Sequence, residues 1–429
     1  MNPLASLARF FRLPDLRQKF LIVLGLIALS RFIYAVPIPG VDISKLSGFL
    51  SNNPAFSLLN IFTGGGLLNF SVALMGVGPY ITSSIIMQLL TLVIPALEAL
   101  SKEGEFGRRK INQYTRLATI PLAFIQGFGT LTFLKNQQIV TQWTPWHLIF
   151  MLLIATGGTM LLVWIGELIS EQGIGNGLSI MVAIGIISSF PNSISNAYKL
   201  YSGGVQTTQL LELLGFLIIG ALALFLIIFM NEGTRNIPVS YARRMRGNSS
   251  YGGVDTNLPI KVNATGVVPI IFAISMVLFP TILAQFLAQA KSLRIQHFGT
   301  AITTFFNNHW YYAIVYFSLV IAFTYFYTFI IFQPNQMAEN LQKQGGFVPG
   351  IRPGLDTEHY LYVVIQRLTL VGAIFLGMIA VLPILTQQLT KVQTISLGGT
   401  SLLIVVAVVL EIMRQVRSQL ITRTYDTYL

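Results

Sequence analysis

Ten continuous apolar stretches dominate the sequence and limit what it can fold into. Most approach the ~20 residues that an α-helix needs to cross the hydrocarbon core of a bilayer. They lie at residues 20–37, 72–95, 113–134, 147–169, 177–190, 210–231, 266–288, 311–332, 368–386 and 398–416. Only 10% of the 429 residues are charged, and the mean hydropathy is +0.68. About a quarter of residues are charged in soluble globular proteins, so the sequence predicts an all-α polytopic membrane protein with ten transmembrane helices.

The basic residues indicate how this protein lies in its membrane. When alternate loops are assigned to opposite sides, 20 of the 27 Lys and Arg residues fall on the side of the two termini, and 7 fall on the other. Cytoplasmic loops carry such an excess, so we expect both termini in the cytoplasm. Residues 1–19 predict an amphipathic basic arm on the membrane surface, and residues 417–429 predict a cytoplasmic tail.

Ten spans also divide evenly into two groups of five. A unit with an odd number of spans must insert its second copy upside down when it is duplicated, which makes an inverted-repeat architecture plausible. We therefore expect an N-terminal half at residues 20–190 and a C-terminal half at residues 191–416. This expectation rests on the span count, because no residue-level repeat is evident.

Three segments between the spans are longer than simple turns. The external segment 38–71 contains an apolar pattern at about residues 56–66 that is too short to cross a membrane and ends at Gly64-Gly65-Gly66. It is either an interfacial helix or a re-entrant helix buried in protein. The other two, at about residues 232–265 and 333–367, lie on the basic side, and loops of this length are commonly functional.

The residue types present exclude most catalytic chemistry. The chain has no cysteine, which rules out disulfides, thiolate metal sites and cysteine nucleophiles, and its four histidines are scattered. It also lacks nucleotide-binding, zinc-protease and serine-hydrolase motifs. We therefore predict no enzyme activity, no metal site and no cofactor.

Ionisable residues within the spans are few and lie near span ends. They are Arg31, Glu167, Glu212, Glu411 and Arg414. Such side chains can extend to the interface, so structural anchoring is the favoured interpretation. A proton- or sodium-coupled carrier normally needs a carboxylate at the midplane. A secondary solute transporter with inverted repeats therefore remains an alternative, but a disfavoured one.

The second span has one unusually mixed face. Val77, Ile81, Ser84 and Gln88 are spaced so that they share one side of a helix. They provide either ordinary helix packing or the wall of a path that admits both polar and apolar cargo.

Eight short motifs in this order give the sequence a family resemblance. They are VPIPG at 36–40, GPYITSSIIMQ at 78–88, KEGEFGRRKINQYTR at 102–116, GIGNG at 173–177, LPIKVN at 258–263, FVPGIRPG at 347–354, RLTLVG at 367–372 and GGTSLL at 398–403. The chain resembles the SecY family, the pore subunits of bacterial Sec protein-conducting channels, from Val36 to the tenth span. The resemblance implies two inverted five-helix halves around a central pore, with a short plug helix.

The resemblance also implies residues that close the pore. A mid-membrane ring of aliphatic side chains would seal around the translocating chain; its members would be Val77, Ile81, Val182, Ile271 and Ile404. The plug would sit against this ring from outside; its residues would be Phe56, Leu58, Leu59, Asn60, Ile61, Phe62, Gly64, Gly65 and Gly66.

The resemblance further implies a lateral gate and docking sites. Spans two and seven would part to release transmembrane segments and signal sequences into the lipid bilayer; the candidate residues are Thr82, Ser84, Gln88, Gln126 and Ser275. The two long basic loops would dock the ribosome, through ribosomal RNA, or the SecA motor ATPase; the candidate residues are Arg243, Arg244, Arg246, Lys261 and Arg352. Alternatively, these charges only enforce topology. SecE-like and SecG-like small membrane subunits are the other implied partners, besides nascent polypeptides.

Overall fold

The chain forms two compact units that consist mainly of helices. The computed structural model describes residues 14–39, 41, 46, 48, 63–67, 69–140, 144–201, 207–241, 244–246, 249–251, 255–263, 265–287, 292–390 and 399–426. The first unit comprises Met1–Val205, Val392–Leu397 and Ile404–Leu429. The second unit comprises Gln206–Lys391 and Gly398–Leu403.

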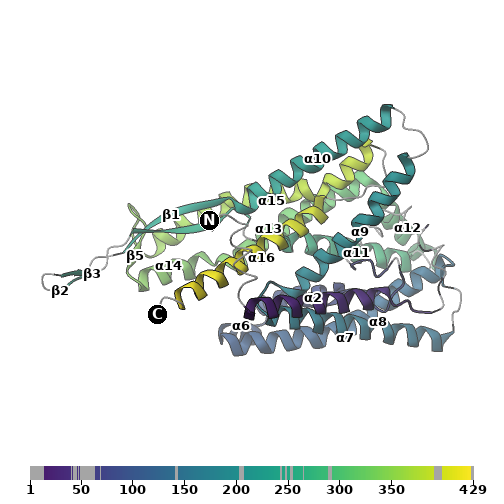
Figure 1. Cartoon of the computed structure of the whole chain (residues 1–429), viewed down its shortest axis with the longest axis horizontal. Coiled ribbons are helices and arrows are strands. Elements are labelled where there is room, and N and C mark those ends of the chain that lie inside the picture. The colour runs from purple at the N-terminus through teal and green to yellow at the C-terminus, as the bar shows by residue number, and fades with distance from the viewer. Residues whose placement is uncertain are drawn as a thin grey trace. The chain divides into compact units, whose positions relative to one another are not determined.

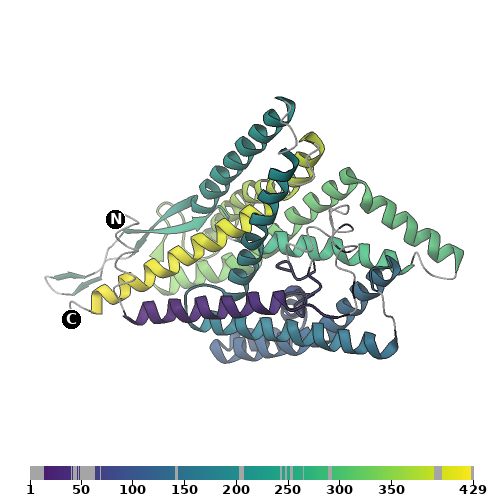
Figure 2. The same ribbon diagram turned by 45° about the vertical axis from the view of Figure 1, so that its right-hand side comes forward.

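Helices make up the described part of the first unit (Figures 1 and 2). They are α2 (Pro14–Ala35), α5 (Gly78–Val93), α6 (Pro95–Lys102), α7 (Glu105–Asn136), α8 (Pro145–Glu171), α9 (Gly177–Tyr201) and most of α16 (Gly399–Asp426). Helix α8 packs against α2, α7 and α9, and α5 packs against α7. Helix α2 begins at Pro14, so the last residues of the expected surface arm form its first turns; residues 1–13 lie outside the described part.

The second unit combines helices with short strands. Its helices are α10 (Thr207–Glu232), α11 (Val268–Leu287), α12 (Leu293–Asn307), α13 (His309–Phe332), α14 (Pro334–Lys343) and α15 (Leu355–Thr390). Its strands are β1 (Thr234–Tyr241), β2 (Arg244–Arg246), β3 (Ser249–Tyr251), β4 (Asp255–Lys261) and β5 (Gly346–Phe347). Helix α13 packs against α11 and α15, and α14 packs against α15.

A helix occupies each of the ten predicted spans. Among the described residues, four helical segments are long and apolar enough to cross a membrane, and the bent pair of α5 and α6 would make a fifth. The four are Pro14–Ala35, Pro145–Glu171, His309–Lys343 and Leu355–Thr386. Shorter apolar helices at Gly177–Pro191, Ile218–Glu232 and Val268–Val277 match three further spans. The last two, α7 and α16, carry several basic residues along their length.

Large apolar side chains also cover outer faces of these helices. Phe225 and Phe229 on α10 are each 65% exposed, and they stack on one another. On α7, Leu117, Ile120 and Phe124 are exposed along one side. Water-soluble proteins rarely expose contiguous apolar surface of this kind, so these faces suit contact with lipid.

Proline marks where the second predicted span differs from a continuous helix. We expected a helix from residue 72, but residues 72–77 form turns and α5 begins at Gly78 with Pro79 in its first turn. Proline suits a first helical turn because it lacks the N–H that would be unpaired there. At Ile94 the backbone is extended (φ −99°, ψ 111°), since Pro95 disfavours a helical conformation in the residue before it. Helices α5 and α6 therefore meet at 101°.

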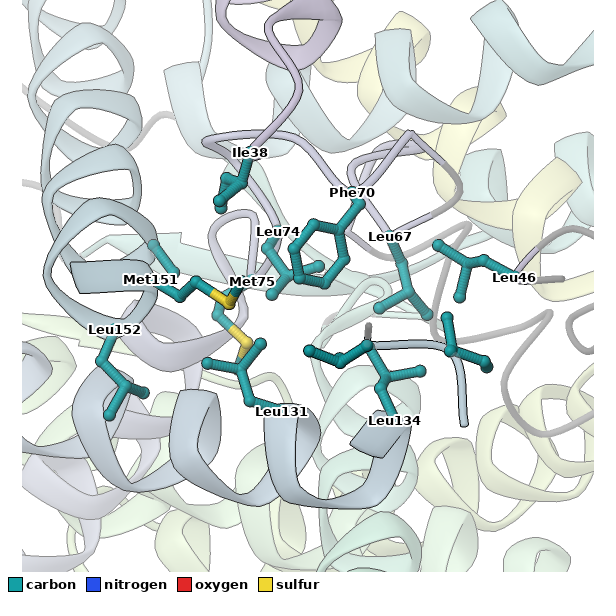
Figure 3. Packing of buried hydrophobic residues seen from close by; sticks show 13 residues of the cluster. Ile38, Leu46, Leu67, Phe70, Leu74, Met75, Leu131, Leu134, Met151 and Leu152 are labelled. Carbon is teal, nitrogen blue, oxygen red and sulfur yellow. The ribbon is translucent and has the colours of Figure 1, made fainter. Parts of the chain in front are cut away.

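An apolar cluster anchors the turns that precede α5 (Figure 3). Phe70, Leu67 and Leu74 from these turns pack against Leu131 of α7 and Met151 of α8, and all are buried. Ile38 N donates to Phe70 O over 2.8 Å and Val72 N donates to Val36 O over 2.9 Å. The segment between α2 and α5 is therefore fixed at its C-terminal end.

A three-stranded antiparallel sheet unites the two long basic loops (Figure 1). Strand β1 pairs with β4 from Thr234↔Lys261 to Ser240↔Asp255, and its other edge pairs with β5 at Ser240↔Phe347. Beneath the sheet lie six buried residues from both loops and α15; they are Ile237, Ile260, Ala338, Val348, Leu361 and Ile365. The two long loops predicted on the basic side thus share one platform, which we call the hairpin platform (residues 234–261 and 346–365).

Candidate functional site

Arg31 of α2 is a charged side chain inside a predicted span that makes several hydrogen bonds. Its Nη1 donates to Gly64 O and to Ser188 Oγ, each over 3.1 Å, and its Nη2 donates to Met181 O over 3.3 Å. The guanidinium carbon also lies 4.7 Å from the centroid of the Tyr34 ring. We expected this side chain to anchor α2 at the membrane interface, but it is instead directed into the protein.

The turn that Arg31 reaches is built from glycines. Gly64 and Gly65 have positive φ angles of 73° and 89°, which side-chain-bearing residues rarely adopt. The ring of Tyr34 packs on Gly64, where an added Cβ would lie 3.1 Å from it. On the other side is Gly185 of α9, where an added Cβ would lie 2.5 Å from Gly64 Cα. We call residues 63–66 the glycine turn. Of the predicted plug, only its three glycines are described, because residues 56–62 lie outside the described part.

The residues predicted to form the aliphatic ring lie on four elements. Val77 is the residue directly before α5, and its side chain is buried. The Val77 carbonyl accepts a hydrogen bond from Ile81 N over 3.1 Å. Val182 of α9 and Ile404 of α16 are buried, whereas Ile81 is partly buried. These four belong to the first unit, and Ile271 of α11, also partly buried, belongs to the second. Convergence of all five on one axis stays a prediction.

The glycine turn contacts the backbone beside two of these ring residues. An added Cβ at Gly76, which precedes Val77, would lie 2.8 Å from Thr63 Cα. Gly185, which contacts Gly64, is three residues after Val182 on α9. The turn that ends the predicted plug thus contacts the residue before Val77 and a residue three positions after Val182.

Polar residues predicted for the lateral gate form two hydrogen-bonded pairs, one between α7 and α5 and one within α5. Gln126 Nε2 donates to Thr82 Oγ1 over 3.4 Å, and Gln88 Nε2 donates to Ser84 Oγ over 3.1 Å. Thr82 Oγ1 in turn donates to Gly78 O over 3.1 Å. Ser275 of α11 bonds within its own helix, to Ile271 O over 3.0 Å, and lies in the second unit. Its pairing with the α5 residues stays a prediction.

One ion pair on the first unit was not anticipated from the sequence. Arg116 Nη2 of α7 lies 2.5 Å from Glu167 Oε2 of α8, and both side chains are partly exposed. Nearby, Ser83 Oγ donates to Thr115 O over 2.6 Å between α5 and α7. Glu167 therefore anchors α8 by pairing with Arg116 of the neighbouring helix α7. The partners are 51 positions apart in the sequence, so local sequence patterns do not predict this pairing.

The docking residues are distributed over the hairpin platform and its tip. Arg352 is exposed in a turn bounded by Gly350 and Gly354, whose φ angles are 83° and 104°. Thr357 Oγ1 of α15 donates to Arg352 O over 2.8 Å, which ties the turn to the helix. Lys261 is exposed in β4. Arg244 and Arg246 lie in β2, which pairs with β3, and Arg243 lies outside the described residues.

Comparisons with known proteins identify the family. The SecY family profile matches residues 71–413. The chain belongs to the SecY family. SecY protein translocase subunits of Streptomyces galbus and Halalkalibacterium halodurans are 40% and 41% identical to it over 443 and 431 residues, with 99% of this chain covered in each case and 100% and 99% of the relatives. The chain is therefore a multi-pass membrane protein and the protein-conducting channel subunit of a bacterial-type protein translocase, and it is not an enzyme.

Solved structures agree in fold. A protein-conducting channel superimposes with a TM-score of 0.63 over 92% of this chain and 91% of that chain. Sec61 from a canine ribosome-channel complex of the endoplasmic reticulum superimposes with a TM-score of 0.60 over the same shares. Both are 17% identical to this chain, so the likeness concerns the fold alone.

Proposed function

We propose that this SecY-family channel closes at a ring of Val77, Ile81, Val182, Ile271 and Ile404, with residues 56–66 as a removable plug. A dry aliphatic constriction blocks ions because they cannot shed their hydration there without replacement ligands. A polypeptide passes because aliphatic side chains part around it. The observation that carries the proposal is the glycine turn, which contacts Gly76, the residue before Val77, and Gly185, three residues after Val182.

We propose that α5 and α11 form the lateral gate, with Gln126 of α7 at its border. The hydrogen bond between Gln126 and Thr82 and the one between Gln88 and Ser84 give α5 a polar surface that could be exchanged for contact with a signal sequence. A transmembrane segment would leave through this gate into lipid, stabilised by about 0.8 kcal/mol for each CH2 group that it buries.

The hairpin platform is the proposed docking site for a cytoplasmic driving partner. Arg352 and Lys261 are exposed there, and arginine forms charge-assisted, often bidentate hydrogen bonds with carboxylate and phosphate groups. The SecA motor presents acidic surface in this proposal, and the ribosome presents RNA phosphate. The structural neighbour from a canine ribosome-channel complex supports the second partner.

Membership of the family supports the remaining proposals. The translocase would include SecE-like and SecG-like small subunits, and the chain would lie in the bacterial cell membrane with both termini in the cytoplasm. The excess of Lys and Arg on the side of the hairpin platform supports this orientation.

Site-specific crosslinking tests the polypeptide pathway. The chain has no cysteine, so single cysteines at Val77 or Ile271 are unique. A secretory polypeptide with one cysteine is stalled in mid-transit and disulfide formation is scored. Lipid-facing controls are Ile125→Cys on α7 and Leu222→Cys on α10, both of which are exposed.

We expect crosslinks from the ring positions and none from the controls. Translocation without crosslinks at either ring position would overturn the pore assignment.

A further inference from the structure

Arg31 links three segments of the first unit through one side chain. It extends from α2, reaches the glycine turn at Gly64 O, and reaches α9 at Met181 O and Ser188 Oγ. The two residues bonded on α9 are seven positions apart, so they lie on the same face of that helix. Val182 lies beside Met181 in the sequence, so the bonds are made next to a proposed ring residue.

The chemistry of this position favours a functional role over simple anchoring. A charged side chain within a transmembrane segment is costly and is usually paired. No carboxylate is bonded to Arg31 among the described residues; its partners are two carbonyl oxygens and a hydroxyl. Its Nε is buried and has no hydrogen-bond partner in the described part of the chain. These bonds can therefore be broken without separating an ion pair.

The surrounding glycines explain why an arginine is needed. Gly64 and Gly185 pack directly, and neither has a side chain that could hold the other. The fork of donors on a guanidinium can bond two groups at once, which the single ammonium of lysine cannot reproduce in that geometry. Arg31 thus makes the polar link between the glycine turn and α9.

We infer that Arg31 is the positioning residue that holds the glycine turn against α9 in the closed channel and releases it when the plug leaves. This inference rests on the proposed plug function of residues 56–66. It assigns to one side chain the balance between closed and open states, since the bond of Arg31 to Gly64 O joins the turn to α9.

Ion leak through the substrate-free channel tests the inference. The full translocase is reconstituted into planar bilayers, and conductance is recorded for the unaltered chain and for Arg31→Gln, Arg31→Lys and Ser188→Ala. Loss of hydrogen bonds from a charged donor should raise the open fraction, and hence the leak, about tenfold or more in Arg31→Gln. Arg31→Lys should leak to a similar extent. Ser188→Ala should raise the leak about threefold over that of the unaltered chain.

A matched control and a stability measurement separate this role from general damage. Arg116→Gln removes another arginine of the same unit, on α7, one whose partner is Glu167 rather than the glycine turn. The inference predicts that Arg116→Gln leaves the leak unchanged. It also predicts that the midpoint of thermal unfolding is the same for Arg31→Gln as for Arg116→Gln. Equal leaks from the two variants would overturn it.

Removal of residues 56–62 distinguishes the inference from the plug proposal. If this deletion leaks and Arg31→Gln does not, the plug proposal stands and the role of Arg31 is wrong. If neither leaks, the plug proposal itself fails and the inference fails with it. We expect both Arg31→Gln and the deletion of residues 56–62 to leak. We also expect the variant that combines them to leak no more than the deletion alone.

Discussion

The glycine turn and the hairpin platform are held in place by opposite means. The glycine turn relies on close backbone contacts and on the hydrogen bonds of one arginine. The hairpin platform has seven paired positions between β1 and β4 and a buried apolar cluster beneath them. A few hydrogen bonds can be exchanged for others at little net cost, whereas a packed core resists rearrangement. We therefore expect the glycine turn at the pore to be releasable and the hairpin platform at the docking surface to be rigid.

The largest effect is expected in the core of the platform. Leu361 is 0% exposed, and Leu361→Ala should cost about 3 kcal/mol through lost burial and a cavity. Amide hydrogen exchange at residues 234–261 should accelerate, while exchange at residues 63–77 stays unchanged. Leu355→Ala on the same helix is the control, since Leu355 is 82% exposed. Acceleration at both regions would show that the two are not independent.

A methyl group at the glycine turn should have the next largest effect. Gly185→Ala places a carbon 2.5 Å from Gly64 Cα and should weaken the closed turn by about 1–3 kcal/mol. The expected result is a raised ion leak with normal partner binding at the platform. Gly25→Ala of α2 has open space around it and should not leak. A tight channel in Gly185→Ala would mean that the turn is not part of the seal.

Charge reversal on the platform should change binding but not closure. Arg352→Glu should weaken binding of the SecA motor or the ribosome about tenfold, and the difference should shrink as salt is raised. Because Arg352 is exposed, the stability of the fold should be unchanged. Arg294→Glu on α12, which we expect on the opposite side of the membrane, is the control. Equal binding by both variants would remove Arg352 from the docking surface.

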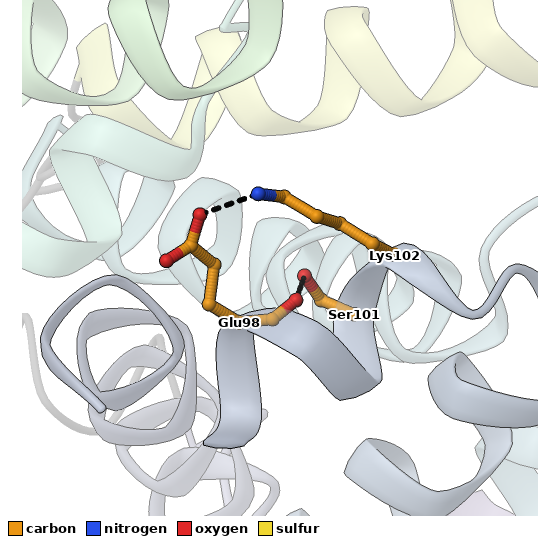
Figure 4. Close-up of polar contacts among 3 residues, drawn as sticks. All are labelled: Glu98, Ser101 and Lys102. Carbon is orange, nitrogen blue, oxygen red and sulfur yellow. Dashed lines mark hydrogen bonds and ion pairs between the residues drawn. The ribbon is translucent and has the colours of Figure 1, made fainter. Parts of the chain in front are cut away.

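The smallest effect is expected at an exposed ion pair outside both regions. On α6, Lys102 Nζ lies 2.7 Å from Glu98 Oε1, with side chains 63% and 49% exposed (Figure 4). Water screens such pairs, so Lys102→Ala should change stability by less than about 0.5 kcal/mol. Thermal unfolding of the translocase measures this baseline. A larger loss of stability would indicate that this ion pair on α6 contributes to the stability of the fold.

The sequence predicted the helices well because membrane spans are encoded locally. An apolar stretch of the right length specifies a helix without reference to distant residues. Helix ends were less accurate: α15 begins at Leu355, thirteen residues before its apolar stretch at 368. Its first turns carry Asp356 and Glu358, which suit a helix N-terminus in water but do not register as apolar.

Other features have local signals in the sequence besides the apolar stretches. Ile237 and Val239 are buried in β1 between exposed neighbours, an alternation typical of a strand. Ile94 before Pro95 was a signal for the break between α5 and α6. The pairing of β1 with β5 had no such signal, because its partners are more than 100 residues apart.

The Arg31 contacts could not be predicted from sequence patterns. Its partners lie 33, 150 and 157 residues away, and two of them are backbone carbonyls, which every residue type carries. The sequence marked Arg31 as unusual, and only the folded chain shows where its side chain points. The family resemblance predicts roles for Gly64–Gly66 and Val182, but it does not point to Arg31, whose side chain bonds Gly64 and Met181.

Hydrogen exchange during transport tests the comparison most directly. The translocase is measured with and without a stalled secretory polypeptide, and amide protection is compared at residues 63–77 and 234–261. We predict that a stalled chain lowers protection within 63–77 at the glycine turn, where the Ser71 N–H donates to Gly66 O, and leaves 234–261 unchanged. Unchanged protection at 63–77, with loss of protection in the hairpin platform instead, would contradict the account.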